Sequence, residues 1–285
     1  MTQETIGLIG PGRMGLAMIR HLVAAGYPVT ATDVSPDQSQ AAEKAGATAV
    51  GSAAEVGKAS TYVIVAVGFE PETLEVTVGP GGLVETMDDG GCIAICSTAS
   101  PETVQGIEEQ AAKRGIDVLD APLCRGRWAA DEGTLLALLG GTDEVVARSR
   151  PVFETFSSDI AHLGPVGHGQ FGKAMNNFFL WINGLGLIEA GRLAEAFGAD
   201  LPKLRDALLM SSGKSAAMED WDRMTFTWAL KDMQIMSEVT DTLGLSLPMA
   251  GAVKEMVKEA RRIKASDPPD WTGKGGVPTD RKPGS

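Results

Sequence analysis

Cysteine is scarce in this chain of 285 residues. Its three cysteines, Cys92, Cys96 and Cys124, are too few and odd in number for a disulfide framework. We therefore expect reduced thiols and a cytoplasmic protein. Cys92 and Cys96 lie within an apolar run that no cluster of His or Cys accompanies, so we expect no metal site.

Positive charge and long apolar runs are also limited. The chain has 25 Lys and Arg against 37 Asp and Glu, a net charge of −12, and its basic residues form no long run. This balance argues against nucleic acid or an anionic membrane surface as a partner, although a local pocket can still bind a small anionic substrate. No apolar stretch reaches the length of a membrane span, and the N-terminus does not resemble a signal peptide.

Apolar residues, in contrast, make up 44% of the chain, which is enough for a substantial core. Over the first 163 residues, short apolar runs alternate with segments punctuated by glycine. This alternation predicts an α/β domain with a doubly wound, mostly parallel sheet. The runs expected to form strands are residues 5–9, 29–33, 47–50, 61–67, 92–96, 117–120, 135–139 and 160–163.

Helical periodicity dominates from Gly169 onward. We therefore expect a dinucleotide-binding domain over residues 1–164 and an all-helical domain over residues 165–265. Residues 266–285 are polar and rich in Gly and Pro, which predicts a flexible tail, loose or ordered by a partner.

A glycine-rich turn joins the first expected strand to the first helix. In such a unit the glycines allow a tight turn, the close approach of a pyrophosphate and the packing of helix on strand. The helix N-terminus then faces the phosphates. We favour this interpretation over a tight turn that binds nothing. The residues expected to bind the cofactor here are Gly10, Pro11, Gly12, Arg13, Met14 and Gly15.

Asp33 ends the second expected strand and selects the cofactor. Its carboxylate can accept hydrogen bonds from both ribose hydroxyls but would repel a 2′-phosphate. Val34 and Ser35 follow, with no arginine to receive that phosphate. We therefore expect NAD as the cofactor and NADP as the less favoured one.

Two further loops are candidates, because a doubly wound sheet binds its ligands at the carboxyl ends of its strands. Ser100 and Pro101 can begin a helix, so a simple turn before that helix explains the presence of Thr98 as well as a role in cofactor binding does. The candidates in these loops are Val67, Gly68 and Thr98 for the cofactor and Ser97 for the substrate.

A second glycine-rich turn, residues 167–172, leads into a long helical pattern. Lys173 and Asn177 lie four residues apart, so they share one face of the expected helix. Lys173 falls within the first two turns, where the positive end of the helix dipole disfavours an ammonium. A lysine near neutrality can exchange protons, and an amide beside it can hold a substrate oxygen. On this stretch alone, a solvated lysine explains the pattern at least as well.

Four motifs in order resemble those of the β-hydroxyacid dehydrogenase family, the relatives of 3-hydroxyisobutyrate dehydrogenase and tartronate semialdehyde reductase. The resemblance reaches to about residue 262. It implies a Rossmann domain followed by an all-helical domain, with the active site between them. The motifs are Gly10 to Gly15, Asp120 to Leu135, Gly167 to Asn177, and the pair Lys231-Asp232.

The resemblance also implies a role for each motif. Lys173 would be the general acid/base, which takes the hydroxyl proton in oxidation while hydride leaves for the nicotinamide. Asn177 would orient a small anionic hydroxyacid, and Lys231 would lie against the cofactor. The backbone of Cys124, Arg125 and Gly126 would hold the substrate's carboxylate.

The chain departs from the family pattern at two positions of the substrate motif. Cys124 replaces a serine and is a poorer hydrogen-bond donor. Arg125 replaces a glycine and adds a fixed charge with a bidentate fork. Its side chain either pairs with Asp131 or Glu132 at the rim, or points inward and binds a strongly anionic substrate.

Two other functions occur on the same fold, that of an imine reductase and that of a non-catalytic module. Imine reductases usually replace the catalytic lysine and non-catalytic relatives have lost it, so the retained Lys173 and Asn177 argue against both.

The expected helix from Phe178 to Leu193 carries apolar residues on more than one face. We therefore expect it to pack against a second subunit in a homodimer or homotetramer.

Overall fold

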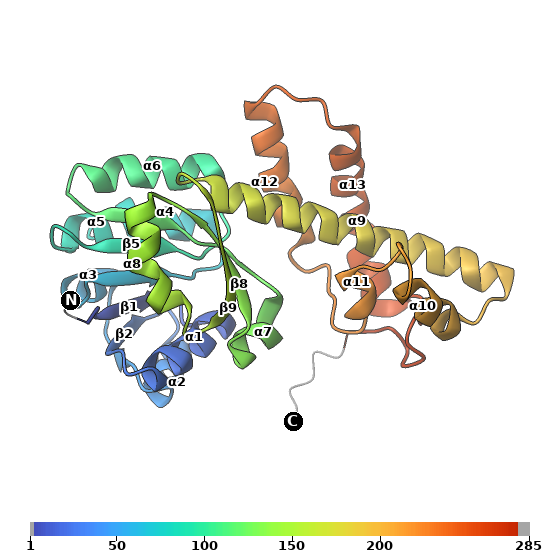
Figure 1. Cartoon of the computed structure of the whole chain (residues 1–285), viewed down its shortest axis with the longest axis horizontal. Coiled ribbons are helices and arrows are strands. Elements are labelled where there is room, and N and C mark those ends of the chain that lie inside the picture. Colours follow the sequence, from blue (N-terminus) through green and yellow to red (C-terminus); the bar gives the residue numbers. More distant parts are fainter. Residues whose placement is uncertain (1–2, 279–285) are drawn as a thin grey trace. The chain divides into compact units, whose positions relative to one another are not determined.

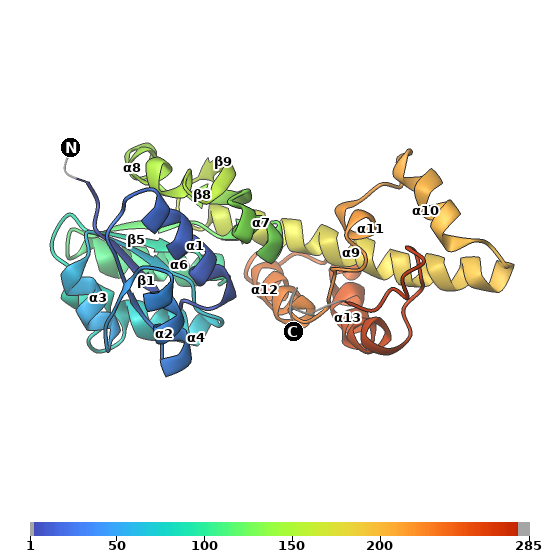
Figure 2. The same ribbon diagram turned by 90° about the horizontal axis from the view of Figure 1, so that it is seen from below.

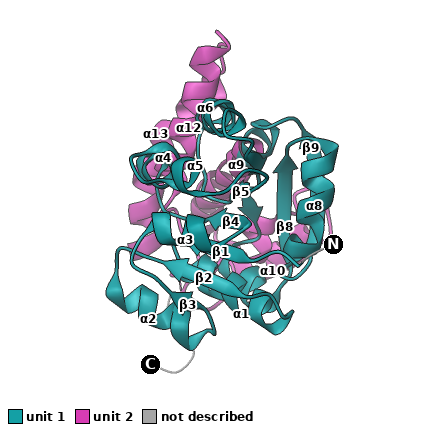
Figure 3. Ribbon diagram, turned by 90° about the vertical axis from the view of Figure 1, so that its left-hand side faces the viewer, with its two compact units in different colours: residues 1–173 teal, residues 174–285 magenta. Residues whose placement is uncertain are grey.

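The computed structural model describes residues 3–278, which form two compact units that divide after Lys173 (Figure 3). The first unit contains a sheet with helices on both faces, and the second is helical. The division falls inside α9 (His168–Phe197), whose first turns belong to the first unit. In the part of the chain that the structure describes, no helix is long and apolar enough to cross a membrane.

The sheet is doubly wound, as the sequence predicts (Figure 1). Six strands, β3, β2, β1, β4, β5 and β6, lie side by side in that order, and each neighbouring pair is parallel. The chain adds β2 and β3 on one side of β1 and then β4 to β6 on the other side, as in a doubly wound sheet. β8 pairs antiparallel with β6 and β7, and β9 runs parallel to β8. In spatial order the strands are β3 (Thr48–Ala49), β2 (Val29–Thr32), β1 (Ile6–Ile9), β4 (Tyr62–Val65), β5 (Cys92–Ile95), β6 (Asp117–Asp120), β8 (Leu135–Gly140) and β7 (Leu123–Cys124), with β9 (Ser157–Gly164) beside β8.

Both faces of the sheet are covered. In β4, Tyr62 and Ile64 belong to one core, and Val63 and Val65 belong to the other. Successive strand side chains point to opposite faces, so a strand covered on both sides is apolar throughout. One face carries α1 (Arg13–Ala24), α2 (Pro36–Lys44), α7 (Gly126–Glu132) and α8 (Asp143–Phe153), and the other carries α3 (Ala53–Ala59), α4 (Glu70–Val78), α5 (Leu83–Thr86) and α6 (Pro101–Ala112).

The strands expected from the sequence are all present, with small differences at their ends. The predicted cap of α6 is confirmed, because Ser100 Oγ accepts the Thr103 N–H at 3.2 Å. The sequence did not predict β7 and α7. Both are short; Arg125, between them, and Gly126, the first residue of α7, adopt left-handed conformations with φ of 80° and 70°.

The second unit is all helical, as expected. Figure 2 shows its helices gathered along α9. Its core includes Trp181 of α9 and, from the later helices, Met233 and Val257. Those later helices are α10 (Leu201–Leu209), α11 (Ala216–Glu219), α12 (Ala229–Thr242) and α13 (Pro248–Ser266).

The segment after α13 is not the loose tail that its composition predicts, as far as residue 278. Trp271 is 1% exposed, and its Nε1 donates a hydrogen bond to the Leu187 carbonyl at 2.9 Å. The buried ammonium of Lys264 binds the Gly276 carbonyl and lies 4.1 Å from the ring centroid of Trp221. One large apolar side chain therefore outweighs the polar composition around it. The rest of the expected tail, residues 279–285, lies outside the described residues.

Candidate active site

The loops at the carboxyl ends of the parallel strands lie side by side, because backbone hydrogen bonds continue past the strands. Ala66 N–H, after β4, donates to the Ile9 carbonyl at 2.8 Å. Ala121 N–H, after β6, donates to the Ile95 carbonyl at 3.0 Å. The loops that carry most of the predicted site residues therefore share one edge of the sheet.

The glycine-rich turn after β1 has the shape that a pyrophosphate requires. Gly10 has a φ of 85°, and a Cβ there would lie 2.8 Å from the Ala66 carbonyl oxygen. A Cβ on Gly15 would lie 2.6 Å from the Gly10 oxygen, so α1 can pack this closely only with glycine. A Cβ on Gly12 would have no neighbour within 4 Å among the described residues. No described side chain caps α1 and its first turn has no acid, so this N-terminus fits an anionic ligand.

Asp33 follows β2 and lines a shallow depression of about 390 Å³. Its Oδ1 accepts the Ser35 N–H at 2.8 Å, which fixes the carboxylate next to the strand end. Glu43 lines the same depression, and no lysine or arginine among the described residues does. Two carboxylates therefore line this depression, and its described lining carries no positive charge.

Val67 and Gly68 follow β4 and lie next to the glycine-rich turn. A Cβ on Gly10 would be 3.0 Å from Val67 Cγ1, so the two loops are in close contact. Glu72 Oε2 accepts the Gly68 N–H at 3.0 Å and the Phe69 N–H at 3.1 Å. The acid thereby caps α4 and fixes the loop that leads into it.

Thr98 is the partly exposed residue of a buried loop after β5. Its neighbours Ser97 and Ala99 are buried, and both are bound by Gln170 of α9. Gln170 Nε2 donates to the Ser97 carbonyl at 2.8 Å, and its Oε1 accepts the Ala99 N–H at 3.2 Å. Gln170 is not predictable from the sequence, because a polar residue in a helical pattern gives no sign of a partner 71 residues away.

Lys173 lies against the loop that carries the substrate motif. Its Nζ donates to the Leu123 carbonyl at 2.8 Å and lies 3.8 Å from Cys124 Sγ. Lys173 is half-buried, and Cys124 is a buried free thiol. The structure therefore brings together the lysine of α9 and the cysteine of the substrate motif, two residues predicted from separate motifs.

Asp120, at the end of β6, anchors the start of α9. The carboxyl group is fully buried, and its Oδ2 accepts the N–H groups of Gly167 and Gln170, each at 3.0 Å. Burial raises the pKa of Asp120 to about 7, although these backbone N–H groups oppose the rise. A Cβ on Gly140 or on Gly169 would lie 3.0 Å from this carboxyl group, so both glycines make room for it. An acid that ends a buried strand was the signal that could have identified this anchor.

Arg125 forms an ion pair with an acid, but with Asp159 instead of the predicted Asp131 or Glu132. Its Nη1 donates to Asp159 Oδ2 at 2.7 Å, to Ser158 Oγ at 2.9 Å and to the Thr134 carbonyl at 2.9 Å. The expected partner Asp131 pairs instead with Arg20, on α1. The guanidinium is therefore held at β9 and its surroundings, and the predicted role of Arg125 toward a substrate stays a prediction.

Asn177 and Lys231 belong to the second unit. Asn177 follows Lys173 by about one turn of α9; it is buried, and its Oδ1 accepts a hydrogen bond from Asn176 Nδ2 at 3.1 Å. Lys231, on α12, has its Nζ 5.9 Å from the ring centroid of Trp228. Their roles toward substrate and cofactor stay predictions.

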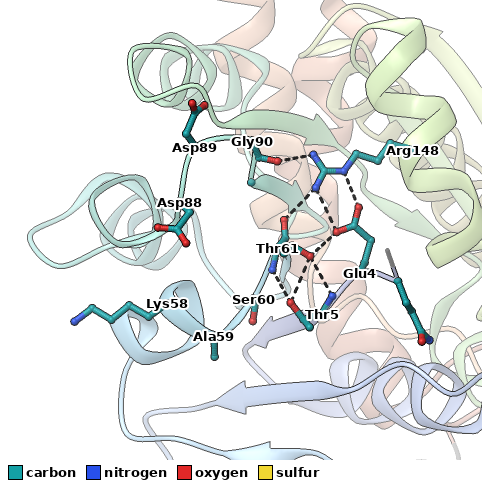
Figure 4. Close-up of a pocket in the computed structure, with 12 residues that line it drawn as sticks. Glu4, Thr5, Lys58, Ala59, Ser60, Thr61, Asp88, Asp89, Gly90 and Arg148 are labelled. Atoms are coloured by element: carbon teal, nitrogen blue, oxygen red, sulfur yellow. Dashed lines mark hydrogen bonds and ion pairs between the residues drawn. The ribbon is translucent and has the colours of Figure 1, made fainter. Parts of the chain in front are cut away.

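A different pocket, of about 290 Å³, lies where the strands begin, at the edge opposite the predicted site (Figure 4). Arg148 donates to Glu4 Oε1 and to the Gly90 carbonyl, each at 2.8 Å, and to the Thr61 carbonyl at 3.3 Å. Burial alone would raise the pKa of Glu4, but hydrogen bonds from Arg148 and Thr61 hold it below its usual value. These bonds join the segments before β1, β4 and β5, so the role of this arginine is structural.

The glycine-rich turn, the acid after β2 and the doubly wound sheet together define a dinucleotide-binding domain of the Rossmann type. Residues 5–164 match the family described as the NAD binding domain of 6-phosphogluconate dehydrogenase. Residues 167–270 match the family described as NAD-binding of NADP-dependent 3-hydroxyisobutyrate dehydrogenase. The chain belongs to the β-hydroxyacid dehydrogenase family, which confirms the resemblance seen in its motifs.

Individual relatives agree with this assignment. The NAD-dependent L-serine dehydrogenase of Pseudomonas aeruginosa is 33% identical over 216 residues, which cover 76% of this chain and 72% of that enzyme. The mitochondrial 3-hydroxyisobutyrate dehydrogenase of Mus musculus is 32% identical over 75% of this chain, which spans only 64% of the mouse enzyme. The structure of a 3-hydroxyisobutyrate dehydrogenase from Mycobacterium tuberculosis shares the fold, with a TM-score of 0.84 at 23% identity over 94% of this chain and 96% of that one.

Proposed function

We propose that the protein is an oxidoreductase that transfers a hydride between NAD and a small 3-hydroxyacid or its oxidised form. The observation that carries the proposal is the position of Lys173 Nζ, 2.8 Å from the Leu123 carbonyl, on the sheet edge that also holds the glycine-rich turn. The names of the two relatives support the class, because L-serine and 3-hydroxyisobutyrate are both 3-hydroxycarboxylates.

NAD, when bound, supplies the acceptor for the hydride. The N-terminus of α1 and the turn before it would hold the pyrophosphate, since both are shaped for an anion. Asp33 would accept hydrogen bonds from the ribose hydroxyls. Val67, Gly68 and Thr98 would line the rest of the cofactor's path along the sheet edge, and Lys231 is the further residue predicted to bind the cofactor.

Lys173 would move the proton. In its neutral form it would accept the hydroxyl proton during oxidation, and as the ammonium it would return that proton during reduction. The Leu123 carbonyl holds the amine in place for this step. The backbone of Cys124 and Gly126 would bind the substrate's carboxylate, with Ser97 beside it, and Asn177 would orient the reacting carbon.

A cofactor-reduction screen with the purified protein tests this function. The substrates are L-serine, 3-hydroxyisobutyrate, other 3-hydroxyacids, dicarboxylates and sulfonates. Lys173→Ala should lower kcat by roughly 10²–10⁴ and leave NAD binding, read by fluorescence titration, intact. Lys254→Ala is the matched control, because Lys254 bonds to Ser237 on the helical unit.

Three results would contradict the proposal. Near-normal turnover by Lys173→Ala would mean that another group moves the proton. Reduction of cyclic imines without oxidation of any hydroxyacid would favour the imine reductase alternative. Tight binding of NAD with no turnover of any substrate would favour a non-catalytic dinucleotide-binding module.

A further inference from the structure

We propose that Gln170 is a positioning residue that holds the loop of residues 97–99, called here the 97–99 loop, at a fixed distance from Lys173. The proposal rests on the proposed function, because it concerns the geometry between the cofactor edge of the sheet and the lysine that moves the proton. Gln170 would act through this loop, without touching substrate or cofactor.

The side chain of Gln170 binds the backbone on both sides of Thr98. It is 1% exposed, and its donor and its acceptor are both used: Nε2 donates to Ser97 O at 2.8 Å, and Oε1 accepts Ala99 N–H at 3.2 Å. Thr98, between the two bonded residues, is the one residue of this loop that reaches solvent. The side-chain amide of Gln170 therefore fixes the position of Thr98.

The backbone of Gln170 is fixed as well. Its N–H donates to Asp120 Oδ2 at 3.0 Å, and the Gly167 N–H donates to the same oxygen. Lys173 follows three residues later, so the two side chains are neighbours on the surface of α9. The first turn of α9 therefore ties the 97–99 loop, the end of β6 and the lysine into one unit.

The contact requires an amide of this length. Ser97 offers a carbonyl, which needs a donor, and Ala99 offers an N–H, which needs an acceptor. Methionine fills the same space and supplies neither. Glutamate matches the amide when protonated, but as a carboxylate it turns a second oxygen toward the Ser97 carbonyl and repels it. In the glutamate variant, the contact with the 97–99 loop is therefore kept at low pH and lost at high pH.

The test compares Gln170→Met and Gln170→Glu with the wild type. Gln105→Met is the matched control, because Gln105 also donates to the backbone, at Val166, but does not touch the 97–99 loop. Gln170→Met should lower kcat roughly 10- to 100-fold, because a shift of about 1 Å in a reacting group can cost 10²-fold. Gln105→Met should keep the wild-type kcat, and circular dichroism melts confirm that each variant is folded at the assay temperature.

The pH profile separates positioning from general destabilisation. The kcat of Gln170→Glu, divided by that of the wild type at each pH, should rise as the pH falls, while the same ratio for Gln170→Met stays flat. Asp120, which accepts the N–H of residue 170, has its pKa raised by burial to about 7, so it titrates in the wild type and in both variants. For this reason the kcat of each variant is compared with that of the wild type at the same pH.

Hydrogen exchange gives a readout that needs no activity. Exchange of the Ala99 amide should be faster in Gln170→Met than in the wild type and unchanged in Gln105→Met. Unchanged exchange at Ala99, or faster exchange with an unchanged kcat, would overturn the proposal. If the wild type turns over no hydroxyacid, the proposed function fails, and the exchange result alone decides whether Gln170 holds the loop.

Discussion

Arg125 is the one non-glycine residue with a positive φ in the described chain, at 80°. A side chain in this left-handed region costs roughly 1–2 kcal/mol, which glycine avoids. The three hydrogen bonds of its guanidinium, to Thr134, Ser158 and Asp159, give a reason why the position tolerates arginine. The hydrogen bond from Arg125 also holds the pKa of Asp159 below its usual value.

Substitution of Arg125 should therefore change stability and leave substrate kinetics unchanged. Arg125→Gly and Arg125→Ala both lose the guanidinium, but only alanine keeps the backbone strain, so Arg125→Ala should be less stable by about 1 kcal/mol. Denaturant unfolding measures that difference. A loss of kcat/KM of about 30-fold in Arg125→Gly, toward an anionic substrate that the wild type prefers, would restore the inward, substrate-binding alternative.

Asp33 should set the preference for NAD. We expect kcat/KM with NAD to exceed that with NADP by at least about tenfold, or about 1.4 kcal/mol, because the carboxylate repels a 2′-phosphate. Asp33→Ala should narrow the ratio more than Glu43→Ala, whose carboxylate lines the same depression. Steady-state kinetics with both cofactors measure the ratios. A wild type that prefers NADP would refute the assignment.

At the scale of the element, the start of α9 depends on one buried acid. Asp120 places a carboxyl group at the positive end of the helix, where negative charge is favourable. Burial opposes that charge and raises the pKa of Asp120 to about 7, against 3.8 for the exposed group. The second oxygen, Oδ1, has no hydrogen-bond partner among the described residues, so the site can accommodate a proton there.

This acid should make the free energy of unfolding depend on pH. A carboxyl whose pKa is raised in the folded state contributes stability that is complete below its unfolded value and lost as the pH rises through its folded value. Asp120→Asn removes this dependence and keeps an oxygen for the two N–H groups. The stability of the wild type relative to Asp120→Asn should therefore fall between pH 5 and pH 8, by about 2–3 kcal/mol.

Chemical unfolding of both proteins at a series of pH values gives this difference. Asp117→Asn is the control, because Asp117 begins the same strand but lies at the opposite edge of the sheet, 3.3 Å from Arg148. A difference that stays constant with pH would show that Asp120 keeps its charge throughout.

The strands could be predicted from sequence because burial on both faces makes each of them continuously apolar, as in Tyr62–Val65. The glycine-rich turn could be predicted because its backbone geometry restricts the residue types. The contacts of Gln170 and Arg125 could not, since their partners lie 71 and 34 residues away and no local pattern encodes them. The packing of the segment around Trp271 could not be predicted either. The composition of a segment averages over its residues, whereas a single buried indole determines where this segment lies.

At the scale of the whole molecule, the second unit has an apolar surface that suits a second copy of the chain. Phe179, Leu193 and Phe197 are 61%, 73% and 87% exposed. Their spacing of 14 and 4 residues places them along one face of α9, an interrupted apolar stripe that a second copy would shield from water. We therefore propose a homodimer or homotetramer that buries this stripe.

Light scattering at micromolar concentration should find the oligomer in the wild type. The double variant Leu193→Glu and Phe197→Glu should be smaller, because each charge would have to leave water at the interface. Leu74→Glu is the control, since Leu74 is also exposed but lies on α4 of the first unit. A monomeric wild type would contradict the proposal.

The buried position of Trp271 has a consequence for how the chain is made. The ribosome finishes the first unit early, so its sheet can close while the helices are still being synthesised. The helical unit cannot do the same, because the indole that bonds to the Leu187 carbonyl follows all the described helices of that unit in the chain. Its core can be completed only after Trp271 has left the ribosome, and a messenger cut short after Ser266 would leave the first unit folded and the helices of the second without this side chain.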